Sequence, residues 1–372
     1  MAFISPRQFG KIAFFFAFIF LVASILPAPA QDQSAPPKTA VQQFKNIQTL
    51  KDIPADQLIP TMQFISGALG VDCEFCHVEH AMDKDDKKEK QTARKMIEME
   101  LAINKSHFKN EIEVTCYTCH RGLPHPVGTP ILTVNTGKMP EHERREISAQ
   151  ESLPTADQIL DKYLVAIGGA DALHKIKTRV QKGTVDTGGE QYSIEIYSEA
   201  PEKRLSISHP SFGESITAFN GQAGWLTTPR GVHPMNSSER QSARVDAQIY
   251  FPAQVRELYQ EFKVLPGESV DGHATLLVTA KGATTPPLRM FFDQQSGLLL
   301  RLIRYTETPL GRNPLEVDYA DYRDTNGVKI PYQWTLTRTN GSFTIRINSI
   351  QQNVAIDEKL FVMPPVHETP HP

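Results

Sequence analysis

The first part of the chain carries apolar residues at helical spacing. Steps of four, three and four residues separate Leu58, Met62, Ile65 and Leu69. This period places the four side chains on one face of an α-helix. A second amphipathic helix is predicted from about residue 89 to 104, after a polar loop. We therefore expect residues 44–126 to form a helical domain.

The second part of the chain has a different pattern. Thr155 and Gln158 form a capping-box pair at the start of an amphipathic helix that ends at Gly168 and Gly169. Beyond Thr178, short alternating apolar segments are separated by turn pairs typical of β-hairpins, among them Asn220-Gly221 and Asn326-Gly327. One further helix is predicted near residues 242–258. Residues 153–366 should form a mostly antiparallel sheet with a helix packed on it.

The remaining segments read as flanking and connecting regions. Arg7 and Lys11 precede a 15-residue apolar run, and Pro27-Ala28-Pro29-Ala30 then offers a cleavage site. This order is that of a secretory signal over residues 1–30, although an uncleaved membrane anchor is the alternative. Residues 31–43 are expected to be a flexible leader, 127–152 a Pro-rich charged linker, and 367–372 a tail. The expected fold class is α + β multidomain, in a protein exported to the periplasm.

The charge balance excludes one class of partner. The chain has 39 Lys and Arg against 42 Asp and Glu, a formal net charge of −3. There is no basic stripe and no recognisable nucleic-acid motif. Nucleic acid is therefore not an expected partner.

The four cysteines carry the clearest chemistry. They occur in two strings, Cys73-Glu74-Phe75-Cys76-His77 and Cys116-Tyr117-Thr118-Cys119-His120. C-x-x-C-H is the attachment signature of c-type haem. Two thiols three residues apart each reach one vinyl group of the same porphyrin, and the following histidine ligates the iron from below. The sequence predicts two covalent haem c groups, with His77 and His120 as proximal iron ligands.

Other uses of C-x-x-C pairs remain as alternatives. The two pairs together would suit a four-sulfur zinc site, and each alone would suit a redox disulfide. Neither alternative explains a histidine directly after both pairs, and no thioredoxin-like βαβ pattern surrounds them.

The second axial ligand of each iron is less constrained by the sequence. Met62 lies 11 residues before Cys73, and Met96 lies 20 residues before Cys116, each on a predicted helix. A methionine on an apolar face is also common in plain core packing. Met99 points only about 60° away from Met96 on its helix. Further distal candidates are His80, His107 and His125.

Residues 44–126 resemble half of the tetrahaem cytochrome c subunit bound to photosynthetic reaction centres of purple bacteria. The match lies in MQFISGALGVDCEFCH (62–77), in ARKM (93–96) with Ile103-Asn104, and in VTCYTCHRG (114–122). The resemblance implies an all-α dihaem cytochrome c domain with Met62 and His77 as one axial pair and Met96 and His120 as the other. This chain has cysteines for two haems, and its C-terminal 220 residues are foreign to that subunit.

Residues 151–366 resemble, more loosely, periplasmic lipoprotein carriers, whose curved antiparallel sheet half-encloses a helix. The similarity lies in the helix after Thr155, the hairpin series, GVKIPY (327–332) and LFVMP (360–364). It implies a curved sheet with a packed helix, and a concave face for an acyl chain or quinone, or else a docking surface.

These observations predict a periplasmic dihaem c-type cytochrome that carries electrons between redox partner proteins, with a membrane complex among the candidate partners. No catalytic residue is expected, because histidine and acidic residues in the second part lack metal or triad spacing. The alternatives are a peroxidase-like dihaem enzyme, which needs one iron with an open distal position, and a lipophile-binding module with a cytochrome as its redox input.

Overall fold

The computed structural model describes residues 38–128, 153–229, 231–282, 287–339 and 341–365. The signal peptide expected at 1–30, most of the linker and the tail lie outside the described residues. Of the leader expected at 31–43, the last residues are described, and Ala40–Gln43 form a short helix, α1, in which Ala40 is buried. Among the described residues no helix is both long enough and apolar enough to cross a membrane.

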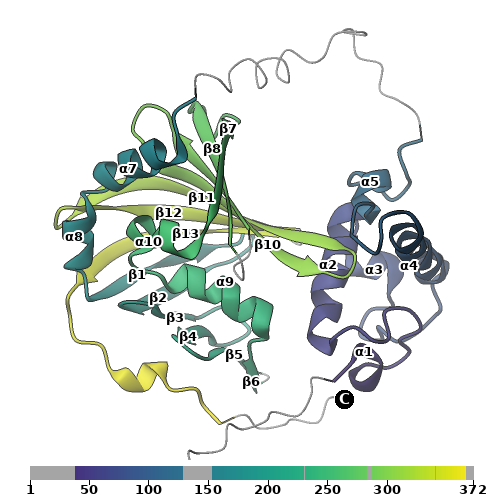
Figure 1. Cartoon of the computed structure of the whole chain (residues 1–372). Coiled ribbons are helices and arrows are strands. Elements are labelled where there is room, and N and C mark those ends of the chain that lie inside the picture. The colour runs from purple at the N-terminus through teal and green to yellow at the C-terminus, as the bar shows by residue number, and fades with distance from the viewer. Residues whose placement is uncertain (1–37, 129–152, 230, 283–286, 340, 366–372) are drawn as a thin grey trace, which may run out of the picture. The chain divides into compact units, whose positions relative to one another are not determined.

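The first part of the chain is helical, as the apolar spacing predicts (Figure 1). After α1 it forms a 3₁₀ turn η1 (Ala55–Gln57) and the helices α2 (Leu58–Leu69), α3 (Cys73–Cys76), α4 (Lys88–His107) and α5 (Cys116–His120). Pro60 lies in the first turn of α2, where a missing backbone N–H breaks no helical hydrogen bond.

The buried face of α2 is not the one expected from its most apolar residues. The structure buries Leu58, Thr61, Phe64 and Ala68, whereas Met62, Ile65 and Leu69 are half-buried. Thr61 is fully buried, and its hydroxyl is satisfied there by donating to the carbonyl of Gln57, at 2.7 Å. The apolar face that carries Met62 is therefore left partly open.

A small apolar cluster packs the helices together. Leu50, Phe64 and Ile97 form it with Leu310, a fully buried residue at a hairpin turn in the second part of the chain. Met62, Ile65 and Cys116 pack against the same cluster. The helical part therefore shares its core with one hairpin of the sheet.

The second part of the chain forms one antiparallel sheet. Its strands are β1 (Thr178–Asp186), β2 (Gln191–Glu199), β3 (Lys203–Ser208), β4 (Ser215–Asn220), β5 (Gly224–Thr228), β6 (Gly231–Pro234), β7 (Glu261–Pro266), β8 (Thr275–Lys281), β9 (Leu288–Asp293), β10 (Leu299–Thr308), β11 (Gly311–Thr325), β12 (Val328–Arg338) and β13 (Gly341–Gln352). The spatial order is β6-β5-β4-β3-β2-β1-β13-β12-β11-β10-β9-β8-β7. Neighbouring strands in the sheet are also consecutive along the chain, with one exception. The first strand, β1, pairs with the last, β13.

The β1–β13 pairing depends on one glycine. The register shifts by one residue between Lys182 and Gly183, as at a β-bulge. A Cβ at position 183 would lie 2.0 Å from the carbonyl oxygen of Arg346. Only glycine allows the two strands to approach this closely.

Helices cover the concave face of the curved sheet (Figure 1). They are α7 (Ala156–Ala166), α8 (Ala170–His174), α9 (Ser237–Ala247) and α10 (Phe251–Leu258). The capping box expected at Thr155 is present, with Gln158 N donating to its hydroxyl at 3.2 Å. The single helix predicted near residues 242–258 is instead two, because Pro252 opens a new helix in its first turn.

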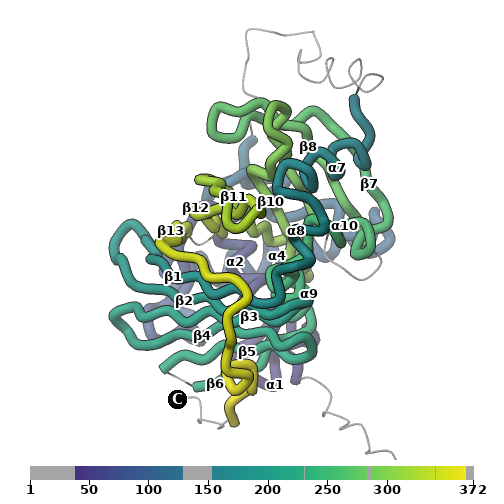
Figure 2. The backbone as a smooth tube through the Cα atoms, turned by 90° about the vertical axis from the view of Figure 1, so that its left-hand side faces the viewer, coloured from purple at the N-terminus to yellow at the C-terminus, as the bar shows by residue number. Residues whose placement is uncertain are grey.

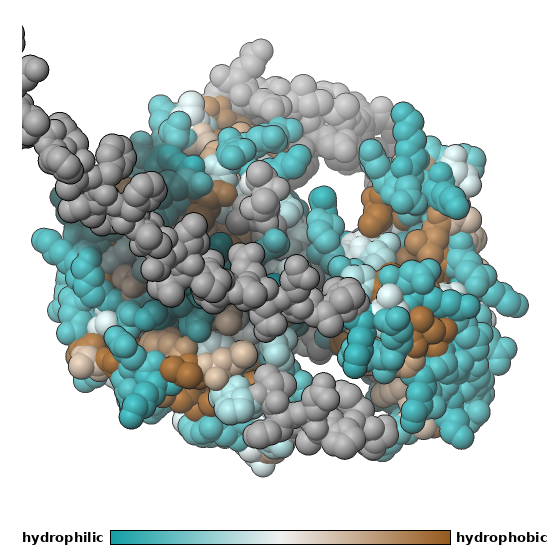
Figure 3. All heavy atoms as spheres, turned by 60° about the horizontal axis from the view of Figure 1, so that its bottom comes forward, coloured by the Kyte–Doolittle hydropathy of each residue, from teal (hydrophilic) through white to brown (hydrophobic). Residues whose placement is uncertain are grey.

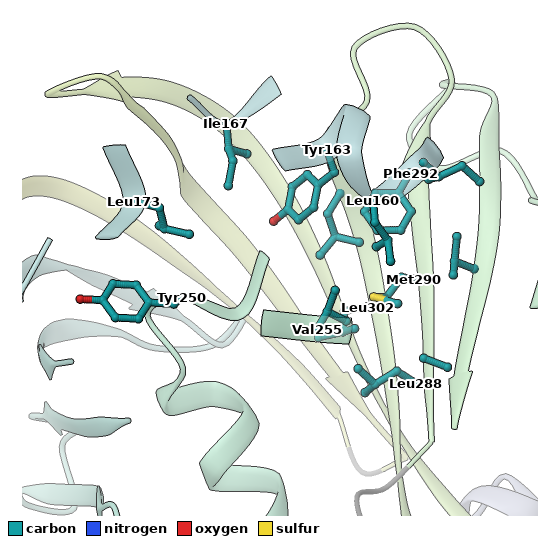
Figure 4. Packing of buried hydrophobic residues seen from close by; sticks show 14 of the residues in the cluster. Leu160, Tyr163, Ile167, Leu173, Tyr250, Val255, Leu288, Met290, Phe292 and Leu302 are labelled. Carbon is teal, nitrogen blue, oxygen red and sulfur yellow. The ribbon is translucent and has the colours of Figure 1, made fainter. Parts of the chain in front are cut away.

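The main core lies between these helices and strands β8–β12. Leu160 and Tyr163 of α7, Leu173 of α8 and Val255 of α10 point towards the sheet (Figure 4). The sheet contributes Leu288, Met290, Phe292 and Leu302 from β9 and β10. On the opposite face, a 3₁₀ turn η2 (Glu358–Phe361) packs Phe361 against Leu205, Ala218 and Trp225 as the chain crosses β3–β5 (Figure 2).

Candidate functional site

The first C-x-x-C-H motif begins directly after α2. Gly70 ends that helix in the left-handed conformation, with a φ of 65°, and Cys73–Cys76 then form α3. Cys73 is exposed and Cys76 is half-buried. Burial, and after it the negative charge of Glu89, raises the pKa of the Cys76 thiol.

The second motif meets the same end of α2. Gly122, two residues after His120, donates its backbone N–H to Ala68 O at 2.9 Å. Its carbonyl oxygen would lie 2.2 Å from a Cβ at position 70. Gly70 and Gly122 therefore lie in contact. The segment that follows the second motif packs on the turn that precedes the first motif.

Both motif histidines are held by the same kind of contact. The Nδ1 atom of His77 hydrogen-bonds the carbonyl oxygen of Met82 at 2.8 Å, and that of His120 the carbonyl oxygen of Leu123 at 3.0 Å. A carbonyl only accepts, so Nδ1 carries the proton in each ring. Nε2 therefore keeps its lone pair, which is the arrangement seen in metal-ligating histidines.

Lys90 supports the first of these contacts. Its side chain is buried in α4, with 8% of the residue exposed, and Nζ donates to Met82 O at 2.8 Å and to Lys84 O at 2.7 Å. The carbonyl of Met82 thus receives both Lys90 and His77. In the sequence, residues 83–90 hold four acidic and four basic residues. Such a run of mixed charges carries no signal for a buried lysine.

Asp85 ties that loop to the helices. Its carboxylate accepts from both terminal nitrogens of Arg94, at 2.8 and 3.0 Å, and from Asn46 Nδ2 at 2.9 Å. Lys90 Nζ lies 3.2 Å away. The hydrogen bonds from Arg94, first, and then from Asn46 hold the pKa of Asp85 well below its usual range.

The second motif is anchored to α4 by Asn104 and Glu100. Asn104 is buried: its Nδ2 donates to Val114 O at 2.7 Å, and its Oδ1 accepts from Val114 N at 3.0 Å. Glu100 Oε2 accepts from the Cys116 thiol at 2.9 Å. Burial raises the pKa of Glu100 to about 7, and also raises that of Cys116. In the sequence, Asn104 stands out only as part of a string matched to the cytochrome subunit, and no pattern marks Glu100.

The predicted distal ligands lie on the expected helices. Met62 is half-buried on α2, whereas Met96 and Met99 of α4 are 38% and 48% exposed. His80, His107 and His125 are exposed, and His80 pairs with Glu79 at 3.3 Å. The assignment of the distal ligands stays a prediction.

The four cysteines are all free thiols. Over the described residues, no three His, Cys, Asp or Glu side chains gather closely enough to hold a metal ion by themselves. The two C-x-x-C pairs therefore do not assemble into a four-sulfur site in this structure.

Around the motifs, large apolar side chains are exposed. More than a third of the residue surface is exposed at Phe75, Met82, Met96, Met99, Leu101, Phe108, Ile112, Tyr117 and Leu123. The face drawn in Figure 3 is mostly hydrophilic, with hydrophobic residues in separate groups. Exposed apolar groups of this kind mark binding surfaces, and a porphyrin offers flat apolar faces. The cysteines, the oriented histidines and this apolar surround fit haem.

A cavity of about 890 Å³ lies beside the second motif. Its wall includes Phe64 and Ala68 of α2, Thr115 and Tyr117 at the motif, and Arg312 of β11. The cavity adjoins the second motif, because Thr115 and Tyr117, the neighbours of Cys116 in the chain, both line it.

Two solved structures show a distant likeness to this chain. Residue identity is 15% and the TM-score 0.40 for a LolA superfamily protein from Nitrosomonas europaea, and 13% and 0.38 for a DUF1329 family protein from Desulfovibrio piger. Each covers 56% of this chain and 98% of the solved chain.

Comparisons with sequences concern the helical part. The chain is 38% identical over 105 residues to the photosynthetic reaction center cytochrome c subunit of Thermochromatium tepidum, and 32% identical over 95 residues to cytochrome c-554 of Chloroflexus aurantiacus. These matches cover 26% and 23% of this chain, and 25% and 23% of the relatives. The chain thus spans about a quarter of the length of these relatives.

The family model of the photosynthetic reaction centre cytochrome C subunit matches residues 18–190. The resemblance seen in the sequence is therefore confirmed. The N-terminal part of this chain is similar to the reaction centre cytochrome c subunit, and that similarity supports a c-type cytochrome electron carrier.

Proposed function

We propose that this protein is a periplasmic dihaem c-type cytochrome that transfers electrons between redox partners. The observation that carries the proposal is the shared geometry of the two motif histidines. In both, Nδ1 is bound by a carbonyl a few residues downstream, and Nε2 is free to ligate iron. Two C-x-x-C-H strings whose histidines make the same contact with a backbone carbonyl favour two sites of one kind.

Each haem has a full set of residues in this chain. Cys73 and Cys76 would hold one haem through thioethers, and His77 and Met62 would ligate its iron. The second set is Cys116, Cys119, His120 and Met96. When bound, haem supplies an iron that accepts and gives up one electron, and methionine ligation raises its potential.

The chain's own residues position these groups. Lys90 and His77 meet at the carbonyl of Met82, so α4 fixes the orientation of the first imidazole. Asn104 fixes the backbone just before Cys116. The short links between the motifs, through Gly70 and Gly122, favour electron transfer from one haem to the other.

Two methionine ligands would leave no open position on either iron. Saturated iron favours electron transfer over binding of peroxide, so we propose a carrier without enzymatic activity. The partners we propose are redox proteins, including a membrane complex. The proposed organisation is a signal peptide (1–30), a cytochrome domain (44–126), a linker (127–152) and a half-barrel-like domain (153–366).

The proposal is tested by making the full chain with a haem-attachment system. Mass spectrometry of the denatured mature protein should show two covalent haems and loss of residues 1–30. The optical and electron paramagnetic resonance spectra should show two low-spin irons. A protein with one haem or none, or a stable high-spin iron, would contradict the dihaem carrier.

A matched pair of variants tests the histidine assignment. His77→Ala should convert one iron to a high-spin or altered form, because that iron loses its proximal ligand. His80→Ala changes an exposed histidine three residues away and should leave both irons unchanged. If the two variants have the same spectra, His77 is not an iron ligand.

A further inference from the structure

The hairpin between β10 and β11 ends in a buried tip. Its turn residues are Pro309 and Leu310, and Leu310 is fully buried although hairpin turns usually lie at the surface. Thr308, which is 4% exposed, closes the turn: its hydroxyl donates to Gly311 O at 2.7 Å and accepts from Leu310 N at 3.4 Å. A turn held by its own hydrogen bonds presents Leu310 as a fixed apolar side chain.

The helical part of the chain buries this tip. Leu310 packs in one cluster with Leu50, with Phe64 of α2 and with Ile97 of α4. The main core of the sheet, between its helices and strands β8–β12, is a different cluster. Leu310 therefore completes the core of the helices and not that of its own sheet.

Glycines allow α2 and the sheet to approach each other closely. A Cβ at Gly311 would lie 2.5 Å from Cζ of Phe64. A Cβ at Gly67 would lie 2.6 Å from Cγ2 of Thr339, the residue after β12. Gly67 lies inside α2, where glycine weakens a helix, so the contact with Thr339 accounts for a glycine at this position.

The same contact accounts for the buried face of α2. Phe64, Gly67 and Ala68 are three and four residues apart, so they share one side of the helix. The hairpin covers that side, since α2 is in contact with β10 and β11. The orientation of α2 about its axis thus follows from the hairpin, and it leaves Met62 half-buried at the border of the cluster.

Groups of both proposed haem sites rest on this cluster. Met62, the proposed distal ligand of the first iron, packs against it, and so does Cys116, a proposed thioether of the second haem. Ile97, inside the cluster, follows Met96 directly in α4. Protein interiors are close-packed, so the side chains around Leu310 respond to any void left there.

The hairpin also lies beside the second motif. The cavity of about 890 Å³ next to that motif is lined by Thr115 and Tyr117 from the motif and by Glu307 and Arg312 from the hairpin. Arg312 Nε lies 2.8 Å from Glu307 Oε1, so this ion pair joins the two strands next to the tip. One hairpin therefore reaches the surroundings of Cys116 both in the cluster and at the cavity.

We propose that the β10–β11 hairpin is a structural part of the haem sites, with Leu310 as a positioning residue for Met62 and Cys116. Leu310 acts through the packing of α2 and α4, so the sheet sets how firmly methionine ligates iron in the helical part. The inference rests on the proposed function and deepens it, because it adds a residue from outside the cytochrome region.

Two leucine substitutions in the full-length holoprotein test the role of the hairpin. Leu310→Ala removes the tip, and Leu288→Ala is the matched control, because Leu288 is 1% exposed in the main core of the sheet. Both variants should unfold at a lower temperature. Only Leu310→Ala should lower the sulfur-to-iron charge-transfer absorption, and only it should speed amide exchange of residues 58–69, by about tenfold. Leu310→Met nearly keeps the volume and should restore both.

The outcomes separate this inference from the dihaem proposal. Unchanged absorption in Leu310→Ala, or an equal loss in Leu288→Ala, would overturn the role of Leu310. Unchanged amide exchange of residues 58–69 would overturn it as well. The number of haems on the wild-type chain, counted by mass spectrometry, tests the dihaem proposal alone, and amide exchange tests the packing of Leu310 whatever that number is.

A second pair of substitutions tests the contact between α2 and the sheet. Alanine favours a helix over glycine, so Gly67→Ala would raise the unfolding temperature if α2 were free of the sheet. Because the new methyl group would meet Thr339, we expect a lower unfolding temperature and a weaker charge-transfer absorption instead. In a chain that already carries Thr339→Gly, the same change should lower neither. A higher unfolding temperature for Gly67→Ala alone, or equal losses with and without Thr339→Gly, would overturn the proposed contact.

Discussion

The carboxylate of Glu100 accepts a hydrogen bond from the thiol of Cys116, with 2.9 Å between Oε2 and Sγ. Glu100 is 4% exposed, and its other oxygen has no hydrogen-bond partner among the described residues. Thioether formation replaces the S–H bond by S–C, so the donor is lost when haem attaches. Since that hydrogen bond lowers the pKa of Glu100 and burial raises it, the carboxyl group of the holoprotein should titrate at about pH 7 or above.

This titration predicts a pH-dependent potential for the second haem. Oxidation adds positive charge near Glu100 and lowers its pKa, so reduction near pH 7 takes up a proton. The potential should fall as pH rises through about 7, by at most about 59 mV per pH unit for one electron, and be flat well below that range. Glu100→Gln should remove the slope.

Potentiometric titration between pH 5 and 9 measures this effect. Glu98→Gln serves as control, because Glu98 is exposed on the same helix. A slope that persists in Glu100→Gln would assign the proton to another group.

The distal ligand of the second haem is predicted to be Met96. Met96→Leu keeps the side-chain volume nearly constant, so packing should lose less than about 1.5 kcal/mol. Axial ligands set haem potentials over about 0.8 V, so this variant should lower the potential of one haem and halve the sulfur-to-iron charge-transfer absorption. Met99→Leu, three residues along the helix, should change neither. The reverse result would make Met99 the ligand, and no change in either would favour His107 or His125.

Lys90 should matter for stability and for the first haem. Lys90→Met keeps the length of the side chain but removes the donors to the carbonyls of Met82 and Lys84. Hydrogen bonds to a charged group contribute about 1.5–3 kcal/mol each, so the free energy of unfolding in urea should fall by at least that amount. The His77 imidazole loses its support, and the spectrum of one low-spin iron should broaden or shift.

The control is Lys88→Met, at an exposed position two residues earlier. It should change the free energy of unfolding by no more than about 0.5 kcal/mol. A similar loss in both variants would mean that general charge, and not the contact with Met82, is responsible.

Gly70 should tolerate no side chain. Its φ is 65°, and an added Cβ would lie 2.2 Å from Gly122 O. Gly122 also has a positive φ, 81°, but a Cβ there meets nothing within 4 Å. Gly122→Ala should therefore cost only backbone strain, about 1–2 kcal/mol, whereas Gly70→Ala should cost clearly more. Thermal unfolding of the two holoproteins compares them, and equal losses would show that the contact with Gly122 is unimportant.

The sequence by itself determined what depends on neighbours along the chain. The apolar period of α2 and α4, the capping box at Thr155 and the hairpin turns follow from local geometry. Cys73, Cys76 and His77 lie within five residues, so their haem-attachment signature is visible in the sequence. For the same reason, the family resemblance of the helical part was visible from short strings, and the comparisons confirm it.

Only the tertiary structure decided which distant groups meet. Lys90 and His77 converge on one carbonyl, and Glu100 reaches Cys116, because α4 packs against both motifs. Leu310 reaches the helices from a hairpin of the sheet far along the chain, and no sequence pattern reveals that contact. A helix break at Pro252 also went unpredicted, since the apolar period of residues 242–258 runs across it. Long-range packing and register depend on the whole fold, and no local pattern contains them.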